Sequence, residues 1–124
     1  MAKKIYSTKV VSLGGEVGAF ITTVKMVILF EESLALPELR DMCVMHKGNK
    51  VEDTIKEGDT LKMGDKAFKI LKVGSEVQKN LTNLGHITLK FDGGAEELLE
   101  GSLHLEDKPI PDIQPGMEIT IERA

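Results

Sequence analysis

The sequence predicts a mainly β protein, namely a small, at least partly closed β-barrel of two duplicated strand units with one short capping helix. Short segments rich in Val, Ile and Thr recur along the 124 residues, and turns rich in glycine separate them. A faint internal repeat, offset by 58 positions, pairs His46 with His104. We therefore expect a single domain over residues 1–124, with the repeat covering approximately 20–63 and 81–121.

Eight strands are expected from runs of β-branched and aromatic residues. They cover residues 3–13, 20–30, 43–46, 60–63, 67–73, 86–91, 102–105 and 117–122. The residues between them are typical of turns, beginning with Gly14-Gly15 and continuing through Lys47-Gly48-Asn49. Further turns are expected at residues 57–59, 64–65, 92–94 and 115–116.

One helix is expected just before residue 85. Ser75 and Gln78 have the spacing of a capping box, and Val77, Leu81 and Leu84 form one apolar stripe. Gly85 supplies the left-handed residue that ends a helix. This helix is expected to cover one opening of the barrel, and shorter helical turns are expected at 36–41 and 95–99.

Composition excludes several classes of function. A net charge of −4 opposes non-specific binding to nucleic acid, which needs a basic face. The longest apolar run, residues 26–30, is too short to cross a bilayer, and Met1-Ala2-Lys3-Lys4 does not open a signal peptide. Cys43 is the only cysteine, so no intrachain disulfide is possible, and it is expected to be small and buried. These features predict a cytoplasmic protein without direct membrane insertion.

The two copies of the repeat differ in charge after their histidines. Lys47, Gly48 and Lys50 follow His46 and offer two cations and a flexible turn to an anion such as a phosphoryl group. The residues after His104 include the carboxylates of Glu106 and Asp107, which would repel it. A neutral imidazole is a competent nucleophile when its other nitrogen is held. His46 is thus the candidate phosphoryl acceptor.

Strand alternation predicts where the histidine side chains point. His104 is expected to share a face with Ser102 and Glu106 and to point outward or into a shallow groove. The repeat places His46 on the matching face, beside Val44, in an exposed apolar patch. Cys43 then points to the opposite face from His46. His86 could steady a phosphoryl group on a neighbouring histidine, as could His104.

Simpler interpretations of the same residues stay open. His46 could merely end an amphipathic strand, and His86 could be a polar residue on the barrel exterior. A metal site built from the three histidines lacks any local ligand spacing, and neither a metal nor a cofactor is expected.

The chain resembles the glucitol/sorbitol-specific IIA components of the sugar phosphotransferase system over nearly its whole length. The residues that carry the resemblance are Asn80-Leu81 followed by Leu84-Gly85-His86-Ile87-Thr88-Leu89-Lys90-Phe91-Asp92-Gly93, Val73-Gly74-Ser75, Cys43-Val44-Met45-His46, Gly58-Asp59, His104, and Pro111-Asp112-Ile113 with Pro115-Gly116. The block from Leu84 to Gly93 is the most specific of these.

The resemblance implies a phosphocarrier. Such a protein accepts a phosphoryl group from the phosphocarrier protein HPr on Nε2 of one histidine and passes it to the IIB domain of the membrane sugar permease, whose IIC component transports the sugar. The resemblance implies that the phosphorylated histidine is the one that ends the Cys-x-x-His stretch, which here is His46. The alternative is a non-catalytic small-barrel module for binding or regulation, which would take up no phosphate.

Overall fold

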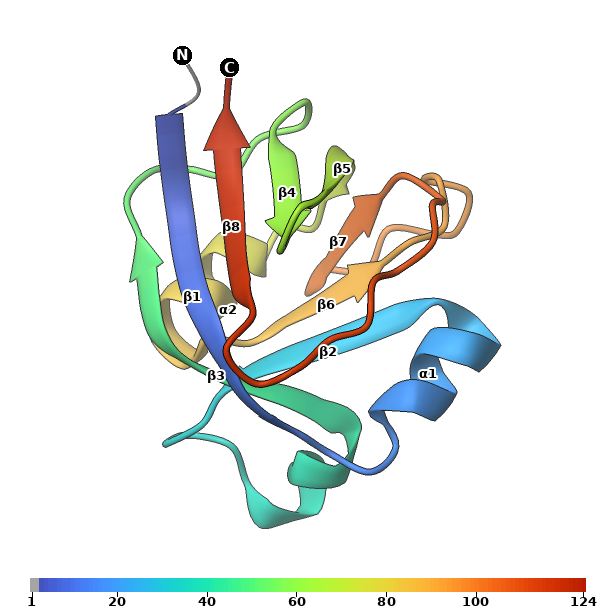
Figure 1. The fold of residues 1–124 in the computed structure, drawn as a ribbon. Helices are drawn as coiled ribbons and strands as arrows, with labels where there is room; N and C mark the ends of the chain where they lie inside the picture. The colour runs from blue at the N-terminus through green and yellow to red at the C-terminus, as the bar shows by residue number, and fades with distance from the viewer. Residues whose placement is uncertain (1–2) are drawn as a thin grey trace.

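A computed structural model shows a closed barrel of eight strands in the order β1-β3-β2-β6-β7-β5-β4-β8 (Figure 1). It describes residues 3–124, so Met1 and Ala2, which belong to the predicted domain and N-terminal segment, lie outside the described residues. The mainly β barrel predicted from the sequence is confirmed. In the part described, no helix is long and apolar enough to span a membrane.

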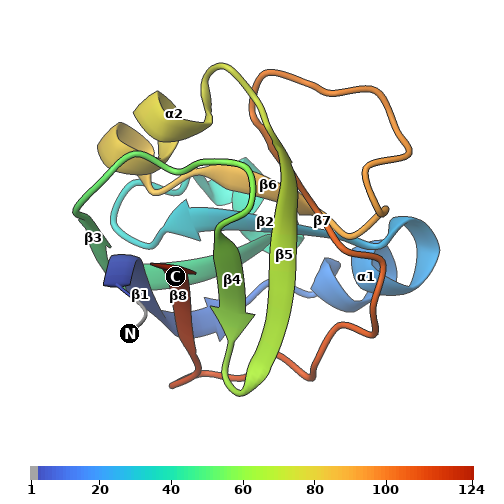
Figure 2. The same cartoon turned by 90° about the horizontal axis from the view of Figure 1, so that it is seen from above.

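The elements follow one another in a regular order. They are β1 (Lys3–Leu13), α1 (Val17–Val24), β2 (Met26–Glu31), the 3₁₀ helix η1 (Pro37–Met42), β3 (Cys43–Val51), β4 (Thr60–Met63), β5 (Lys66–Val73), α2 (Val77–Leu84), β6 (Ile87–Lys90), β7 (Ser102–Leu105) and β8 (Glu118–Arg123). The helices α1 and α2 lie on different sides of the barrel (Figure 2).

The two halves of the chain have the same topology. In each, a strand, a helix and two strands follow in order, and the last two of these strands pair in parallel, β2 with β3 and β6 with β7. The parallel pairs set Val44 opposite Leu29 and Leu103 opposite Leu89. The bounds of the duplication stay a prediction.

The strand pairing gives the two histidines different places within this topology. On β1, Leu13 pairs with Val44 and Val10 with His46, while on β5, Val73 pairs with Leu103 and Ile70 with Leu105. His46 is thus equivalent to Leu105, and Met45 to His104. The predicted pairing of His46 with His104 is wrong by one residue, and one residue reverses the face of a strand.

The segment 20–30, predicted as one strand, is a helix followed by a strand. Its β-branched residues Ile21, Thr22 and Thr23 favour a strand, but packing overrides this weak preference. Val17 is buried and Ile21 packs on the core from α1. Lys25 then ends the helix in the left-handed conformation, with φ 52°.

Four further local predictions are corrected. The strand β3 runs through Lys47-Gly48-Asn49, predicted as a turn, because Gly48 takes a positive φ of 81° at an irregularity in the β1–β3 register. Residues 95–99 form no helix. Ser75 makes no capping bond to α2, since the N-cap is Glu76, and Leu84 of the predicted apolar stripe is exposed.

Most apolar side chains fill the barrel, and a smaller cluster lies outside it. The interior contains residues from every strand, including Val44, Leu103 and Leu105. The outer cluster joins Cys43 and Met45 to Phe30 and Ala35. Cys43 is therefore small and buried, as predicted, on the face of β3 opposite to His46.

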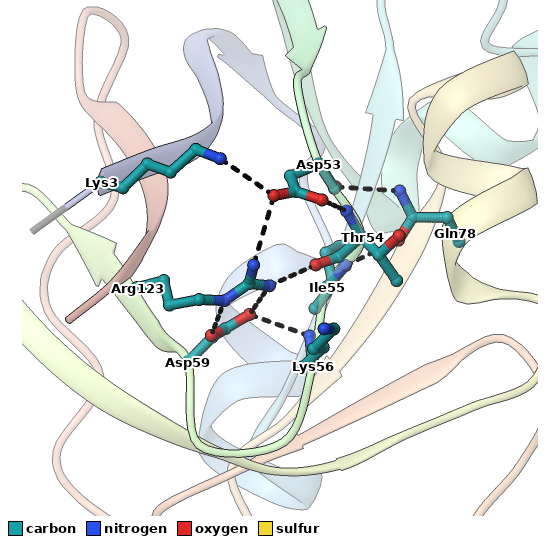
Figure 3. Close-up of polar contacts among 8 residues, drawn as sticks. All are labelled: Lys3, Asp53, Thr54, Ile55, Lys56, Asp59, Gln78 and Arg123. Atoms are coloured by element: carbon teal, nitrogen blue, oxygen red, sulfur yellow. Dashed lines mark hydrogen bonds and ion pairs between the residues drawn. The ribbon is translucent and has the colours of Figure 1, made fainter.

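The loop of residues 52–59 is tied to both α2 and β8 (Figure 3). The guanidinium of Arg123 donates to both carboxylate oxygens of Asp59, to Asp53 and to the carbonyl of Thr54. From α2, Gln78 accepts the N–H of Ile55 and donates to the carbonyl of Asp53. These contacts fix the position of α2, whose other end reaches His46.

Candidate functional site

His46 is fully buried and points into the barrel from the middle of β3. Its neighbours across the sheet are Val10 on β1 and Glu31 on β2. The predicted exposed face beside Val44 is wrong, because Val44 belongs to the barrel core. The residue that ends α2, Gly85, lies over the imidazole.

Both ring nitrogens of His46 are within hydrogen-bonding distance of a partner. Nε2 lies 2.7 Å from the carbonyl oxygen of Gly85, and Nδ1 lies 2.5 Å from the hydroxyl oxygen of Thr8. The Thr8 hydroxyl is also 3.0 Å from the carbonyl oxygen of Lys47. The ring is therefore held in one orientation.

Burial lowers the pKa of His46 below its ordinary value of 6.5, and this outweighs the Gly85 hydrogen bond and the nearby Glu31 carboxylate, which raise it. His46 is therefore a neutral imidazole at pH 7. Because a carbonyl oxygen can only accept, the proton of this neutral ring lies on Nε2.

Glu31 supplies a negative charge beside the site. Its pKa lies below the ordinary value, first because the hydroxyl of Ser33 donates to the carboxylate and also because the Ser33 N–H does so. A carboxylate here disfavours a phosphoryl dianion on His46.

Gly85 brings the end of α2 into close contact with these side chains. Its φ is +61°, and its N–H bonds back to the carbonyl of Leu81, as the predicted helix stop requires. A Cβ at this position would lie 2.8 Å from Cβ of Glu31 and 3.0 Å from Cε1 of His46. Only glycine fits between them.

His86 follows Gly85 and is half-buried rather than free on the exterior. Its ring stacks on Phe30, with the ring centroids 4.7 Å apart, and its Nδ1 donates to the carbonyl of Leu29 at 3.2 Å. The backbone thus brings His86 near His46 through Gly85, while its ring packs on the outer cluster.

His104 lies elsewhere, in the second half of the barrel. It points away from the barrel interior as predicted, but it is fully buried rather than exposed. Its Nδ1 is 2.9 Å and 3.1 Å from the two carboxylate oxygens of Asp92, and its Nε2 has no hydrogen-bond partner among residues 3–124. Asp92 also accepts the N–H groups of Gly94 and Glu96, so the pair holds the segment after β6.

The predicted phosphate-stabilising residues all lie on β3. Lys47 is exposed, and because it neighbours His46 on a strand, its side chain points to the other face. Gly48 is exposed, and Lys50 pairs with Glu52 at 3.3 Å. A phosphate role for these residues stays a prediction.

Reasoning from the sequence missed Thr8 and the carbonyl group of Gly85. The pattern of β1 gives Thr8 no special signal, and only the pairing of β1 with β3 places it beside His46. Among residues 3–124, no group of three or more His, Cys, Asp or Glu side chains is placed to hold a metal ion.

Comparisons with known proteins agree on one family. Residues 5–120 match the family model of the glucitol/sorbitol-specific IIA component of the phosphotransferase system. The glucitol/sorbitol-specific EIIA components of Shigella flexneri and Escherichia coli K12 are each 31% identical over 119 residues, covering 95% of this chain and 94% of theirs. The crystal structure of a phosphotransferase system IIA component from Enterococcus faecalis V583 superimposes with a TM-score of 0.78 at 31% identity, over 91% of this chain and 96% of that one. The chain belongs to the glucitol/sorbitol-specific IIA component family of the phosphotransferase system.

Proposed function

We propose that this protein is a phosphocarrier that accepts a phosphoryl group from phospho-HPr on Nε2 of His46. It then passes the group to the IIB domain of a glucitol/sorbitol permease, which takes up and phosphorylates the sugar. This role places the protein in the cytoplasm, with HPr and the IIB/IIC components as partners. The observation that carries the proposal is that His46 is kept neutral by burial while the Thr8 hydroxyl holds its Nδ1.

The transfer exchanges one nitrogen–phosphorus bond for another. Nε2 of His46 attacks the phosphorus in line, the bond to the donor histidine breaks, and the donor imidazole keeps the electron pair. For Nε2 to attack, its proton must first leave and the Gly85 carbonyl must move away from it, because that carbonyl lies 2.7 Å from the nitrogen. The carbonyl of Gly85 thus forms a cover over Nε2. We expect docking of a partner protein to move this cover away.

Exposed leucines beside the cover support such docking. Leu84 directly precedes Gly85, and Leu34 follows Glu31 by three residues; their exposed fractions are 39% and 46%. Exposed aliphatic side chains suit a transient interface of modest area. Supporting roles for His86 and His104, and for Lys47, Gly48 and Lys50 at the phosphate, belong to this proposal as lesser parts.

The test is phosphoryl transfer from phosphoenolpyruvate through enzyme I and HPr, read by intact mass. We expect one acid-labile phosphoryl group on the wild type and none on His46→Gln. His86→Gln is the comparison variant, since it removes a neighbouring half-buried histidine. It should still take up one phosphoryl group, because a supporting role changes the rate of transfer and not the acceptor atom. Label on His46→Gln would move the acceptor to another residue. No label on the folded wild type would favour the non-catalytic binding module.

A further inference from the structure

The hydroxyl of Thr8 lies between two groups that can each hydrogen-bond to it. Thr8 is buried on β1, with Nδ1 of His46 at 2.5 Å and the carbonyl oxygen of Lys47 at 3.0 Å from its oxygen. A hydroxyl has one proton and two acceptor lone pairs, so it donates to one partner at a time. The direction of its hydrogen bond therefore depends on whether Nδ1 of His46 is an acceptor or carries a proton.

In the covered state, the proton of the neutral His46 ring lies on Nε2 and bonds to the carbonyl of Gly85. Nδ1 is then a bare acceptor, and Thr8 donates its proton to it. The carbonyl of Lys47 receives no proton from Thr8 in this arrangement.

For Nε2 to attack phosphorus it must be free of its proton, and the proton of the neutral ring then lies on Nδ1. The Thr8 oxygen can then accept from Nδ1–H and turn its own proton to the carbonyl of Lys47, 3.0 Å away. Only hydrogen positions change at this end of the ring, and every polar group keeps a partner. A carbonyl oxygen in place of the Thr8 hydroxyl can only accept a hydrogen bond. It could therefore bond to Nδ1–H, but not to the bare Nδ1 of the covered state.

We propose that Thr8 is the positioning residue of His46, which holds the ring in both tautomers and so directs the phosphoryl group to Nε2. This inference rests on the proposed function. Before the step, the proton on Nε2 leaves for solvent and a proton from solvent reaches Nδ1, so the neutral ring has a bare Nε2. The Nε2 lone pair then forms the bond to phosphorus, and the donor nitrogen–phosphorus bond breaks with its electron pair on the donor nitrogen. The ring carries a positive charge until the Nδ1 proton is released to solvent, after which Nδ1 again accepts the proton of the Thr8 hydroxyl.

The experiment compares Thr8→Val, which keeps the shape and removes the hydroxyl, with Thr8→Ser, which keeps the hydroxyl. Thr8→Val should accept the phosphoryl group from phospho-HPr about ten- to a hundredfold more slowly, as expected when one buried hydrogen bond is lost in the transfer. Thr8→Ser should restore most of the rate. Thr120→Val is the matched control, since Thr120 is a buried threonine on the adjacent strand β8.

Nitrogen-15 NMR of the His46 ring gives a readout that loss of packing alone would not move. Without phosphate, the wild type should show the Nε2–H tautomer with Nδ1 shifted by the hydrogen bond from Thr8, while Thr8→Val should show mixed tautomers and lose that shift. Wild-type protein that rests with the proton on Nδ1 would overturn the inference even if Thr8→Val does not fold.

The outcomes separate the two proposals. Equal rates for Thr8→Val and the wild type would overturn the role of Thr8 and leave the phosphocarrier intact. A folded wild type that takes up no phosphate from active donors would overturn both.

Discussion

At the scale of the residue, Gly85 combines two constraints that separate substitutions can distinguish. Its φ of +61° strains any side chain, and its missing Cβ leaves room for Glu31 and His46. In Gly85→Ala, the first constraint costs about 1 kcal/mol. The second forces Glu31 and the imidazole to shift, so we expect slower phosphoryl acceptance as well. Thermal unfolding and the transfer assay measure the two effects.

Gly64→Ala is the control for Gly85→Ala. Gly64 has a φ of +63°, but a Cβ there would meet only the end of the Met117 side chain, at 3.7 Å. It should lose a similar free energy of unfolding from backbone strain and keep the wild-type transfer rate. If Gly64→Ala slowed transfer as much as Gly85→Ala, contact with His46 would not be the cause.

Individual residues of the site could be predicted from the sequence more readily than their orientation. His46 and Gly85 stand out by their residue type and neighbours, whereas the face on which His46 lies depends on register. The offset that aligns the histidines places His46 beside the wrong equivalent, since the pairing with β1 and β2 matches it to Leu105. Residue identity and strand register conflict here, and register decides burial.

At the scale of the element, the two helices show how well the start of a helix can be predicted from local sequence. Both begin after a glycine followed two residues later by Glu-Val, at Gly14 and at Gly74. A Cβ at Gly14 would lie 2.0 Å from the carbonyl oxygen of Arg40, and one at Gly74 would lie 2.3 Å from that of Glu100. This shared pattern could have predicted α1, although the β-branched residues of that segment favour a strand.

The anchoring of α2 gives a prediction at the same scale. Gln78 accepts the N–H of Ile55 at 2.9 Å, so Gln78→Ala leaves that amide without its partner. We expect a loss of about 1 kcal/mol in the free energy of unfolding and faster hydrogen exchange at Ile55. Because α2 carries Gly85, phosphoryl transfer should also change.

Lys79→Ala is the matched control for Gln78→Ala. It removes an exposed side chain from the next position of the same helix. The Ile55 amide should exchange at the wild-type rate in this variant. Faster exchange at Ile55 in Lys79→Ala would mean that shortening any side chain at the start of α2, rather than losing the Gln78 contact, exposes the loop.

At the scale of the whole molecule, closure of the barrel joins the ends of the chain. β8 pairs with both β1 and β4, and Arg123 ties its end to the loop of residues 52–59 (Figure 3). Short strands and turns predicted a barrel, but the two parallel pairs and the strand order depend on which apolar faces meet in space. Local pattern does not determine these long-range choices.

The molecule should lose stability with acid in two windows, one that begins at pH 6.5 and one that begins at about pH 3.8. Burial lowers the pKa of His46, so the unfolded chain binds a proton below 6.5 that the folded chain excludes. Burial alone would raise the pKa of Asp59, but hydrogen bonds from Arg123 and the N–H of Lys56 hold it below its ordinary value of 3.8. Both folded pKa values are lowered, so both contributions are present at pH 7 and are lost as the pH falls.

Urea unfolding between pH 8 and pH 3 tests this with one variant for each window. The free energy of unfolding should fall by up to about 1.4 kcal/mol per pH unit below 6.5 as His46 resists protonation, and again below about 3.8. His46→Gln should remove the first fall and keep the second. Asp59→Asn should cost about 2 kcal/mol at pH 7 and weaken the second fall alone. An unchanged slope near pH 6 in His46→Gln would contradict this prediction. It would mean that the pKa of His46 is the same in the folded and the unfolded chain, despite the burial of its side chain.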